Sequence, residues 1–300
     1  MKVVVVGLGV QGLKRSKVAN RDLFCTVDPV NMEADYRDIK DVPINSYNAV
    51  ILCIPDKKKY SLISFCIENN KHILIEKPLI LSNLTYFKQF EKRANAKNLF
   101  IYVAYNHRFE PNFVNIKKFL SAQTIGDIYS CRIFYGNGTS KLVKNSIWRD
   151  SGDGVLSDIG SHLIDLLFFW FGLNKINFKI IKSIKHENKS PDHVIIGSKK
   201  TTPFYELEMT LCSWKNEFKL DIFGSKGSVH INNLCKWGDS KMVFRKRVFP
   251  SGIPYEKHFV AKYGDKTWKK EYDYFKKMIK IGKKTSFEKD ILIQKTLNFI

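Results

Sequence analysis

Short apolar runs alternate with amphipathic stretches along the first third of the chain. The runs are rich in β-branched residues and predict strands at 2–6, 23–27, 48–54, 72–76 and 99–105. Helical spacing of apolar positions predicts one helix that ends near Ala19, a second at 56–69, and a third at 82–96 with Ser82 as its N-cap. Strands that alternate with helices predict a doubly wound parallel sheet, and hence an α/β domain over residues 1–107.

The pattern changes after Pro111. A helix at 111–122 is followed by a long strand at 128–135, and most later segments alternate apolar and polar residues, as half-buried strands do. We expect these strands at 176–184, 193–198, 204–212, 218–223, 228–231 and 242–249, and two helices at 265–282 and 287–300. The sequence therefore predicts an α+β domain over residues 108–300, built on a mainly antiparallel open sheet.

One predicted helix of this second domain carries polar residues within its apolar spacing. Apolar residues recur at helical intervals from Val155 to Trp170, and Asp158 and His162 lie four positions apart. That spacing puts both side chains on one face, where the carboxylate can hold the orientation and tautomer of the imidazole. Such a pair can serve acid–base catalysis, but on an amphipathic helix it is more often a surface pair or a structural histidine. The pattern alone leaves both interpretations open.

Composition narrows the classes of protein. The chain has 300 residues, 44% of them hydrophobic, and a formal net charge of +21. Only nine of the 50 basic residues are arginine, whereas nucleic-acid recognition favours the arginine fork, so we expect no nucleic-acid partner. The apolar run after Asp165 is far shorter than the roughly 20 residues of a membrane span, so we expect no membrane partner.

The cysteines and the N-terminus indicate a compartment. None of the six cysteines forms a CxxC pair, and no histidine stands at zinc-ligand spacing from them, so we expect no metal site. Most of these thiols lie in apolar runs, which is typical of a reducing environment. The N-terminus leads directly into a predicted strand without a signal-peptide pattern. We therefore expect a cytoplasmic protein.

A glycine-rich turn follows the first strand and opens a helix. In this context a GxGxxG motif binds the pyrophosphate of a dinucleotide: the glycines allow a tight turn, a close approach to the ligand and close packing of helix on strand. Asp28 ends the second strand, where an acid can accept the ribose hydroxyls of adenosine and repel a 2′-phosphate. This favours NAD over NADP, and the alternative is that Asp28 starts the turn before Pro29. The expected cofactor-binding residues are Gly7, Leu8, Gly9, Val10, Gln11, Gly12, Asp28, Cys53, Ile54, Pro55, Glu76 and Lys77.

Three motifs taken in order carry a resemblance. The GLGVQG turn, the tripeptide Glu76-Lys77-Pro78 and the run DIGSHLID at 158–165 resemble the Gfo/Idh/MocA oxidoreductase family, which includes glucose–fructose oxidoreductase and inositol dehydrogenase. The resemblance covers essentially the whole chain and implies a Rossmann domain followed by an open antiparallel sheet. The family's catalytic Lys falls on Lys77, and its Asp and His fall on Asp158 and His162. A cis Lys77–Pro78 bond is also implied. Lys59 departs from the pattern, because many members have His at that position.

The resemblance implies reversible oxidation of a secondary alcohol, with hydride passing to the nicotinamide ring. His162 is the candidate base, Lys77 donates to the same oxygen, and Asp158 orients the imidazole or accepts from the substrate. Which of Lys77 and His162 takes the proton stays open. Two alternatives share the fold: a non-catalytic NAD-binding sensor or regulator, and a glycosidase that uses tightly held NAD. A kinase interpretation of the glycine-rich loop finds no HRD or DFG motif.

Four residues suggest a substrate: Asn106, Arg108, Trp148 and Arg149. The guanidinium forks suit a diphosphate or carboxylate, and Trp148 offers a flat apolar face to a sugar ring. The segments after Ser213 also resemble family members that act in bacterial surface-polysaccharide synthesis. We therefore expect a nucleotide-linked sugar. The alternatives are a free polyol such as an inositol, and arginines that form salt bridges between domains. We also expect a homo-dimer or homo-tetramer through the C-terminal sheet.

Overall fold

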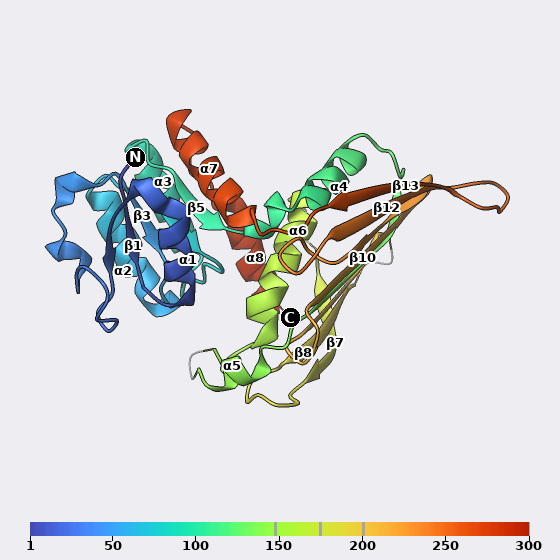
Figure 1. The fold of residues 1–300 in the computed structure, drawn as a ribbon, viewed down its shortest axis with the longest axis horizontal. Coiled ribbons are helices and arrows are strands. Elements are labelled where there is room, and N and C mark those ends of the chain that lie inside the picture. The colour runs from blue at the N-terminus through green and yellow to red at the C-terminus, as the bar shows by residue number, and fades with distance from the viewer. Residues whose placement is uncertain (147–148, 174–175, 200–201, 300) are drawn as a thin grey trace. The chain divides into compact units, whose positions relative to one another are not determined.

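The computed structural model describes residues 1–300 except 147–148, 174–175, 200–201 and 300. It contains two compact units, each of which has its own sheet (Figure 1). The first unit comprises Met1–Asn106 and Thr267–Gln294, and the second comprises His107–Lys266 and Lys295–Ile300.

The first unit is built on a five-stranded parallel sheet in the order β2-β1-β3-β4-β5. Its apolar runs are almost fully buried, as expected for strands covered on both faces. The order reverses between β1 and β3, and open sheets of this kind bind ligands at such a switch point. The predicted doubly wound sheet is confirmed. Its elements are β1 (Val3–Val6), α1 (Val10–Ala19), β2 (Leu23–Val27), β3 (Ala49–Leu52), α2 (Asp56–Glu68), β4 (His72–Glu76), α3 (Thr85–Ala96) and β5 (Ile101–Ala104).

Helix α3 begins later than the sequence indicated. Leu84 occupies the N-cap position, and no side chain caps it from there. Instead, Asn83 Oδ1 accepts from both the N–H and the hydroxyl of Thr85, at 2.8 and 2.9 Å. The prediction that Ser82 caps this helix is therefore wrong, because Asn83 supplies the accepting oxygen nearer to the first turn.

A C-terminal helix returns to the first unit. We expected all residues from 108 onward in the second domain, but α7 (Thr267–Lys280) and the start of α8 (Glu288–Phe299) lie in the first unit. The reason is the apolar face of α7, where Tyr272, Phe275 and Met278 recur at helical spacing. These three side chains complete a core cluster with Val3, Val5, Ala19, Ala49, Ile51, Leu74, Phe100, Tyr102 and Ala104.

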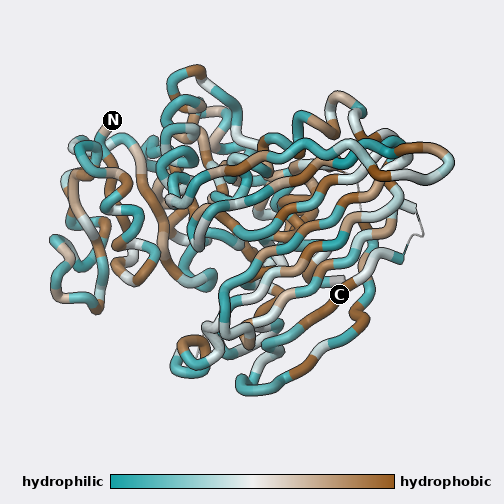
Figure 2. The backbone as a smooth tube through the Cα atoms, turned by 45° about the vertical axis from the view of Figure 1, so that its right-hand side comes forward, coloured by the Kyte–Doolittle hydropathy of each residue, from teal (hydrophilic) through white to brown (hydrophobic). Residues whose placement is uncertain are grey.

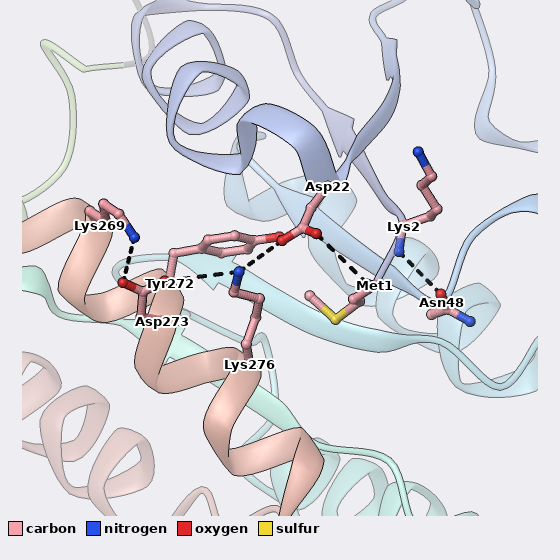
Figure 3. Close-up of polar contacts among 8 residues, drawn as sticks. All are labelled: Met1, Lys2, Asp22, Asn48, Lys269, Tyr272, Asp273 and Lys276. Atoms are coloured by element: carbon pink, nitrogen blue, oxygen red, sulfur yellow. Dashed lines mark hydrogen bonds and ion pairs between the residues drawn. The ribbon is translucent and has the colours of Figure 1, made fainter.

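Polar contacts hold the middle of α7 (Figure 3). Asp22 Oδ2 accepts from Tyr272 Oη at 3.0 Å and from Lys276 Nζ at 2.9 Å, while Oδ1 lies 3.7 Å from the N-terminal amine. Burial raises the pKa of Tyr272, and the Asp22 carboxylate raises it further, so this hydroxyl stays a donor. Asp22 therefore fastens α7 next to the start of the chain.

The second unit is built on an eight-stranded sheet in the order β13-β12-β11-β10-β6-β9-β8-β7. Among the described strand pairs of this sheet, only β6–β9 is parallel, so the predicted mainly antiparallel sheet is confirmed. Its strands are β6 (Ile128–Gly136), β7 (Phe178–Ile184), β8 (His193–Ser198), β9 (Phe204–Thr210), β10 (Glu217–Gly224), β11 (Gly227–Asn232), β12 (Ser240–Lys246) and β13 (Tyr255–Ala261). Its helices are α4 (Pro111–Ser121), α5 (Ser140–Lys144) and α6 (Ser161–Phe171).

Hydrophilic and hydrophobic positions alternate along the strands of this sheet (Figure 2). One face packs against α4 and α6, where Phe113 contacts Trp170 and Phe218 with ring centroids 5.2 and 5.0 Å apart. The edge strand β13 was not predicted, because most of its side chains are exposed and its apolar signal is weak. Within the described residues, no helix has the length and apolar content needed to cross a bilayer.

Candidate active site

The glycine-rich turn joins β1 to α1 in the way the motif predicts. Gly7 has φ +91°, and a Cβ there would collide with the carbonyl oxygen of Cys53. A Cβ on Gly12 would likewise collide with the carbonyl oxygen of Gly7. Gly9 has no neighbouring atom within 4 Å of an added Cβ, so packing within the protein does not require a glycine there. Val10, the first residue of α1, is 71% exposed. The open helix N-terminus above Gly9 fits a pyrophosphate.

The Asp28 carboxylate closes the loop after β2. Its Oδ2 accepts from Leu8 N–H at 2.7 Å, and its Oδ1 accepts from the N–H groups of Val30 and Asn31 at 2.8 and 2.9 Å. Burial raises the pKa of Asp28, but these hydrogen bonds outweigh it and hold the pKa below its usual value. Asp28 thus forms the turn that we kept as its alternative role. The lone pairs that remain on its oxygens can still accept from a ribose hydroxyl.

A buried lysine holds the turn that carries Lys77. The Lys77–Pro78 bond is cis, as the resemblance implied. Lys59 is 3% exposed, and its Nζ donates to the carbonyl oxygens of Glu76 and Pro78 at 2.7 and 2.6 Å. The same ammonium pairs with Asp56 Oδ1 at 2.7 Å. Because the two carbonyls flank Lys77, Lys59 fixes the backbone on both sides of the candidate catalytic lysine.

Glu76, which we expected at the cofactor, belongs to a buried ion network. Arg15 on α1 pairs with Glu76 Oε1 through Nε at 2.5 Å and with Glu271 Oε2 through Nη2 at 2.8 Å. Burial lowers the pKa of Arg15, but the two carboxylates outweigh it and raise the pKa. Burial raises the pKa of Glu271 to about 7, against the opposing effect of Arg15. This network joins α7 to the helix that follows the glycine-rich turn.

The predicted helix at 155–170 begins with a π-helical turn. Leu156–Gly160 forms that turn and α6 continues from Ser161, so Asp158 lies on the π turn and His162 on the first turn of α6. Short π turns are rare within helices and frequent at functional sites. The wider turn also means that the regular one-turn geometry, which we assumed for the pair, does not describe Asp158 and His162. The proposed orienting role of Asp158 stays a prediction.

His162 lies against a second imidazole. The ring centroids of His107 and His162 are 4.1 Å apart, with an angle of 42° between the planes. His107 is 3% exposed, while His162 is half-buried. Lys236 Nζ lies 3.3 Å from His107 Nε2 and 2.7 Å from Tyr135 Oη. Sequence analysis missed His107, Tyr135 and Lys236, because they come from three separate segments and lie outside the three motifs that carry the resemblance.

The two candidate substrate arginines are engaged within the second unit. Arg108 makes a bidentate pair with Asp165: Nε donates to Oδ2 at 2.7 Å and Nη2 donates to Oδ1 at 2.8 Å. Asp165 is 1% exposed. Arg149 Nη2 lies 3.2 Å from Asp158 Oδ2, and the Arg149 side chain is 33% exposed. The fork of Arg108 is therefore committed to a buried carboxylate, whereas Arg149 keeps donors that face solvent. Both salt bridges lie inside one unit, and not between domains as the alternative supposed.

The other two substrate candidates have different outcomes. Asn106 is 7% exposed, and its Nδ2 donates to Thr267 Oγ1 at 2.8 Å. Its amide therefore links the two segments of the first unit, where the first segment ends and α7 begins. Trp148 lies outside the described residues. In the part of the chain that the structure describes, no group of three or more His, Cys, Asp or Glu side chains could hold a metal ion.

Comparison with known proteins identifies the family. The sequence profile of the oxidoreductase family with an NAD-binding Rossmann fold matches residues 7–105, and that of the GFO/IDH/MocA C-terminal domain matches residues 113–230. The chain thus belongs to the Gfo/Idh/MocA family of oxidoreductases.

Curated relatives match part of the chain. The scyllo-inositol 2-dehydrogenase (NADP(+)) IolW of Bacillus subtilis is 29% identical over 129 residues, which are 42% of this chain and 35% of that protein. The levoglucosan dehydrogenase of Pseudarthrobacter phenanthrenivorans is 30% identical over 147 residues, which are 47% of this chain and 37% of that protein. The chain therefore matches about a third of the length of these relatives.

Solved structures match nearly the whole fold. A levoglucosan dehydrogenase in complex with NADH superposes with a TM-score of 0.81 at 19% identity, covering 100% of this chain and 95% of that one. A putative NADPH-dependent oxidoreductase of Desulfitobacterium hafniense gives 0.83 at 16% identity, covering 99% and 93%. At these identities the likeness shows a shared fold.

Proposed function

We propose that this chain is an NAD(P)-dependent dehydrogenase that oxidises a secondary hydroxyl of a sugar or polyol, or reduces the corresponding ketone. The observation that carries the proposal is the half-buried His162 imidazole, which follows a π turn bearing Asp158 in a chain of an NAD-binding oxidoreductase family. A nicotinamide cofactor held at the glycine-rich turn would supply the hydride acceptor in the oxidative direction. His162 takes the hydroxyl proton, and Lys77 donates a hydrogen bond to the oxygen as negative charge develops.

The sensor alternative has no specific support in the structure. A binding protein would need the glycine-rich turn but no base. The chain keeps Lys77 on a turn held from both sides by Lys59, and it keeps a half-buried imidazole next to a buried one. Steady-state formation of NADH or NADPH from a sugar or polyol tests the proposal directly. Tight cofactor binding without turnover across a broad substrate panel would favour the sensor.

We propose NAD(H) as the preferred cofactor, because a carboxylate at position 28 repels a 2′-phosphate. Wild-type protein should bind NAD(H) more tightly than NADP(H) in isothermal titration calorimetry. In Asp28→Ser the discrimination should fall, because the repulsive charge is gone. The exposed Arg37 provides the competing explanation, since its guanidinium donates to the carbonyl oxygens of Asp28, Asn31 and Met32 in the same loop. A wild-type preference for NADP(H) that disappears in Arg37→Ala would assign the ribose contact to that cation instead.

For the substrate, we propose a free sugar or polyol. The diphosphate site that we expected from the sequence relied on two guanidinium forks, and the Nε–Nη2 edge of Arg108 is already bonded to Asp165. The matched relatives from B. subtilis and P. phenanthrenivorans are named for scyllo-inositol and levoglucosan. A nucleotide-linked sugar in surface-polysaccharide synthesis, and a homo-dimer or homo-tetramer through the second sheet, stay predictions.

A substrate panel separates these possibilities. Free sugars, inositols and anhydro-sugars should be compared with UDP-, GDP- and CMP-linked sugars, by following nicotinamide absorbance in both directions. We expect turnover on at least one free compound. Turnover confined to linked sugars would instead support the nucleotide-sugar prediction. The solvent-facing donors of Arg149 would then be the candidate diphosphate contact.

A further inference from the structure

Lys236 lies in the segment between β11 and β12 and reaches the imidazole pair of the second unit. Its Nζ is 2.7 Å from Tyr135 Oη and 3.3 Å from His107 Nε2, and it lies 4.4 Å from the ring centroid of Trp237. An ammonium group has three donors and no acceptor. Tyr135 Oη and His107 Nε2 must therefore both accept from it.

This contact fixes the protonation of His107. A nitrogen that accepts a hydrogen bond carries no proton, so His107 is neutral and its single ring proton is on Nδ1. Adding a second proton to His107 would break the bond to Lys236 and place two cations side by side.

Several ionisable groups surround the ammonium. Burial lowers the pKa of Lys236 to about 8, against three carboxylates that raise it, Asp265, Glu110 and Asp158. Lys236 is therefore a cation between about pH 5 and pH 7, where histidines titrate. The titratable groups around Lys236 and His107 come from five neighbouring elements. They are Tyr135 on β6, Glu110 at the start of α4, Asp158 on the π turn, His162 on α6, and Asp265 in the segment before α7.

We propose that Lys236 is a positioning residue that directs the proton taken up by the imidazole pair to His162 and away from His107. By holding His107 neutral, it leaves His162 as the single base of the pair. The inference rests on the proposed function, which makes His162 the acceptor of that proton.

The first experiment needs no substrate and is done on the full-length wild-type chain. Long-range ¹H–¹⁵N correlation spectra distinguish the two neutral tautomers of histidine from the imidazolium. The two resonances are assigned by their loss in His107→Gln and His162→Asn. Between pH 5.5 and 7.5, His107 should remain the neutral Nδ1–H tautomer while His162 titrates. An Nε2–H tautomer or a titrating His107 would overturn the proposal, whether or not any alcohol is turned over.

The second experiment repeats these spectra on variants. In Lys236→Met the ammonium that donates to His107 is gone, so His107 should take up a proton and titrate between pH 5.5 and 7.5. Lys236→Arg keeps a charged donor and should leave His107 as the neutral Nδ1–H tautomer. Lys179→Met, which removes an exposed cation from β7, is the matched control. A His107 that stays neutral across this range in Lys236→Met would show that Lys236 does not set its protonation, and would reject the proposal.

Discussion

Alanine at Lys77 or at His162 should lower kcat by about 10²–10⁴-fold, the usual contribution of a general acid or base. The fold and the cofactor affinity should stay within a few fold of wild type. Lys77 is expected to act on the substrate oxygen, and its backbone is held by Lys59 from the carbonyls on both sides. Removing its side chain beyond Cβ therefore leaves that turn in place. Stopped-flow and steady-state rates, with circular dichroism and cofactor titration, separate chemistry from folding.

Controls of the same residue type sharpen this test. Lys92→Ala removes an exposed lysine from α3, and His258→Ala removes an imidazole that is 62% exposed on β13. Both should leave kcat unchanged. His162→Asn keeps a polar side chain of similar size and guards against a packing defect. Near-normal turnover in Lys77→Ala would remove Lys77 from the mechanism. Loss of the fold in both His162 variants would assign His162 the structural role that its pattern also allowed.

The fold was predictable where local pattern and global architecture agree. Runs such as VVVV at 3–6 and AVIL at 49–52 are buried on both faces, and burial on both faces gives the strongest strand signal a sequence can carry. The edge strand Tyr255–Ala261 was missed because an edge strand buries little and needs no apolar alternation. The return of α7 to the first sheet was also missed. Its apolar face was visible in the sequence, but the sheet that it covers was not.

In the candidate site, only the residues that belong to sequence motifs were predictable. Gly7 and Gly12 were identifiable because a side chain at either would collide with a backbone carbonyl. These two glycines of the motif therefore mark positions where only glycine fits. Arg108 was misjudged because a sequence shows a cation but not the buried carboxylate that engages it. Lys236 and His107 are far apart in the chain, and neither has a neighbour that signals the contact. Pairings across long sequence separations decide which charges remain available, and a single sequence does not record them.

Arg15→Met should lower the free energy of unfolding by about 3–5 kcal/mol at pH 7, the usual effect of removing one partner from a buried ion network. Arg15 is 1% exposed and Glu271 is 0% exposed, so the charges left behind cannot be rescued by water. Glu76 and Glu271 would then lose the guanidinium that pairs with both of them. Methionine keeps most of the aliphatic volume of arginine, so little of the loss comes from a cavity. Chemical denaturation at pH 7 measures the change.

The same network predicts a pH dependence that Glu271→Gln should remove. The folded pKa of Glu271, about 7, is higher than its ordinary value of 4.5. Between these values the folded state binds more protons than the unfolded state, so stability falls as the pH rises from 4.5 through 7. Glutamine has no such titration. The free energy of unfolding of Glu271→Gln should therefore depend less on pH across this window. The stability of the variant relative to wild type should increase as the pH rises. Because Arg15 keeps Glu76 as a partner in this variant, the loss seen in Arg15→Met should not appear. Parallel stability curves for wild type and Glu271→Gln between pH 4.5 and 7 would show that Glu271 is ionised in the folded protein throughout, and that Arg15 outweighs the cost of its burial.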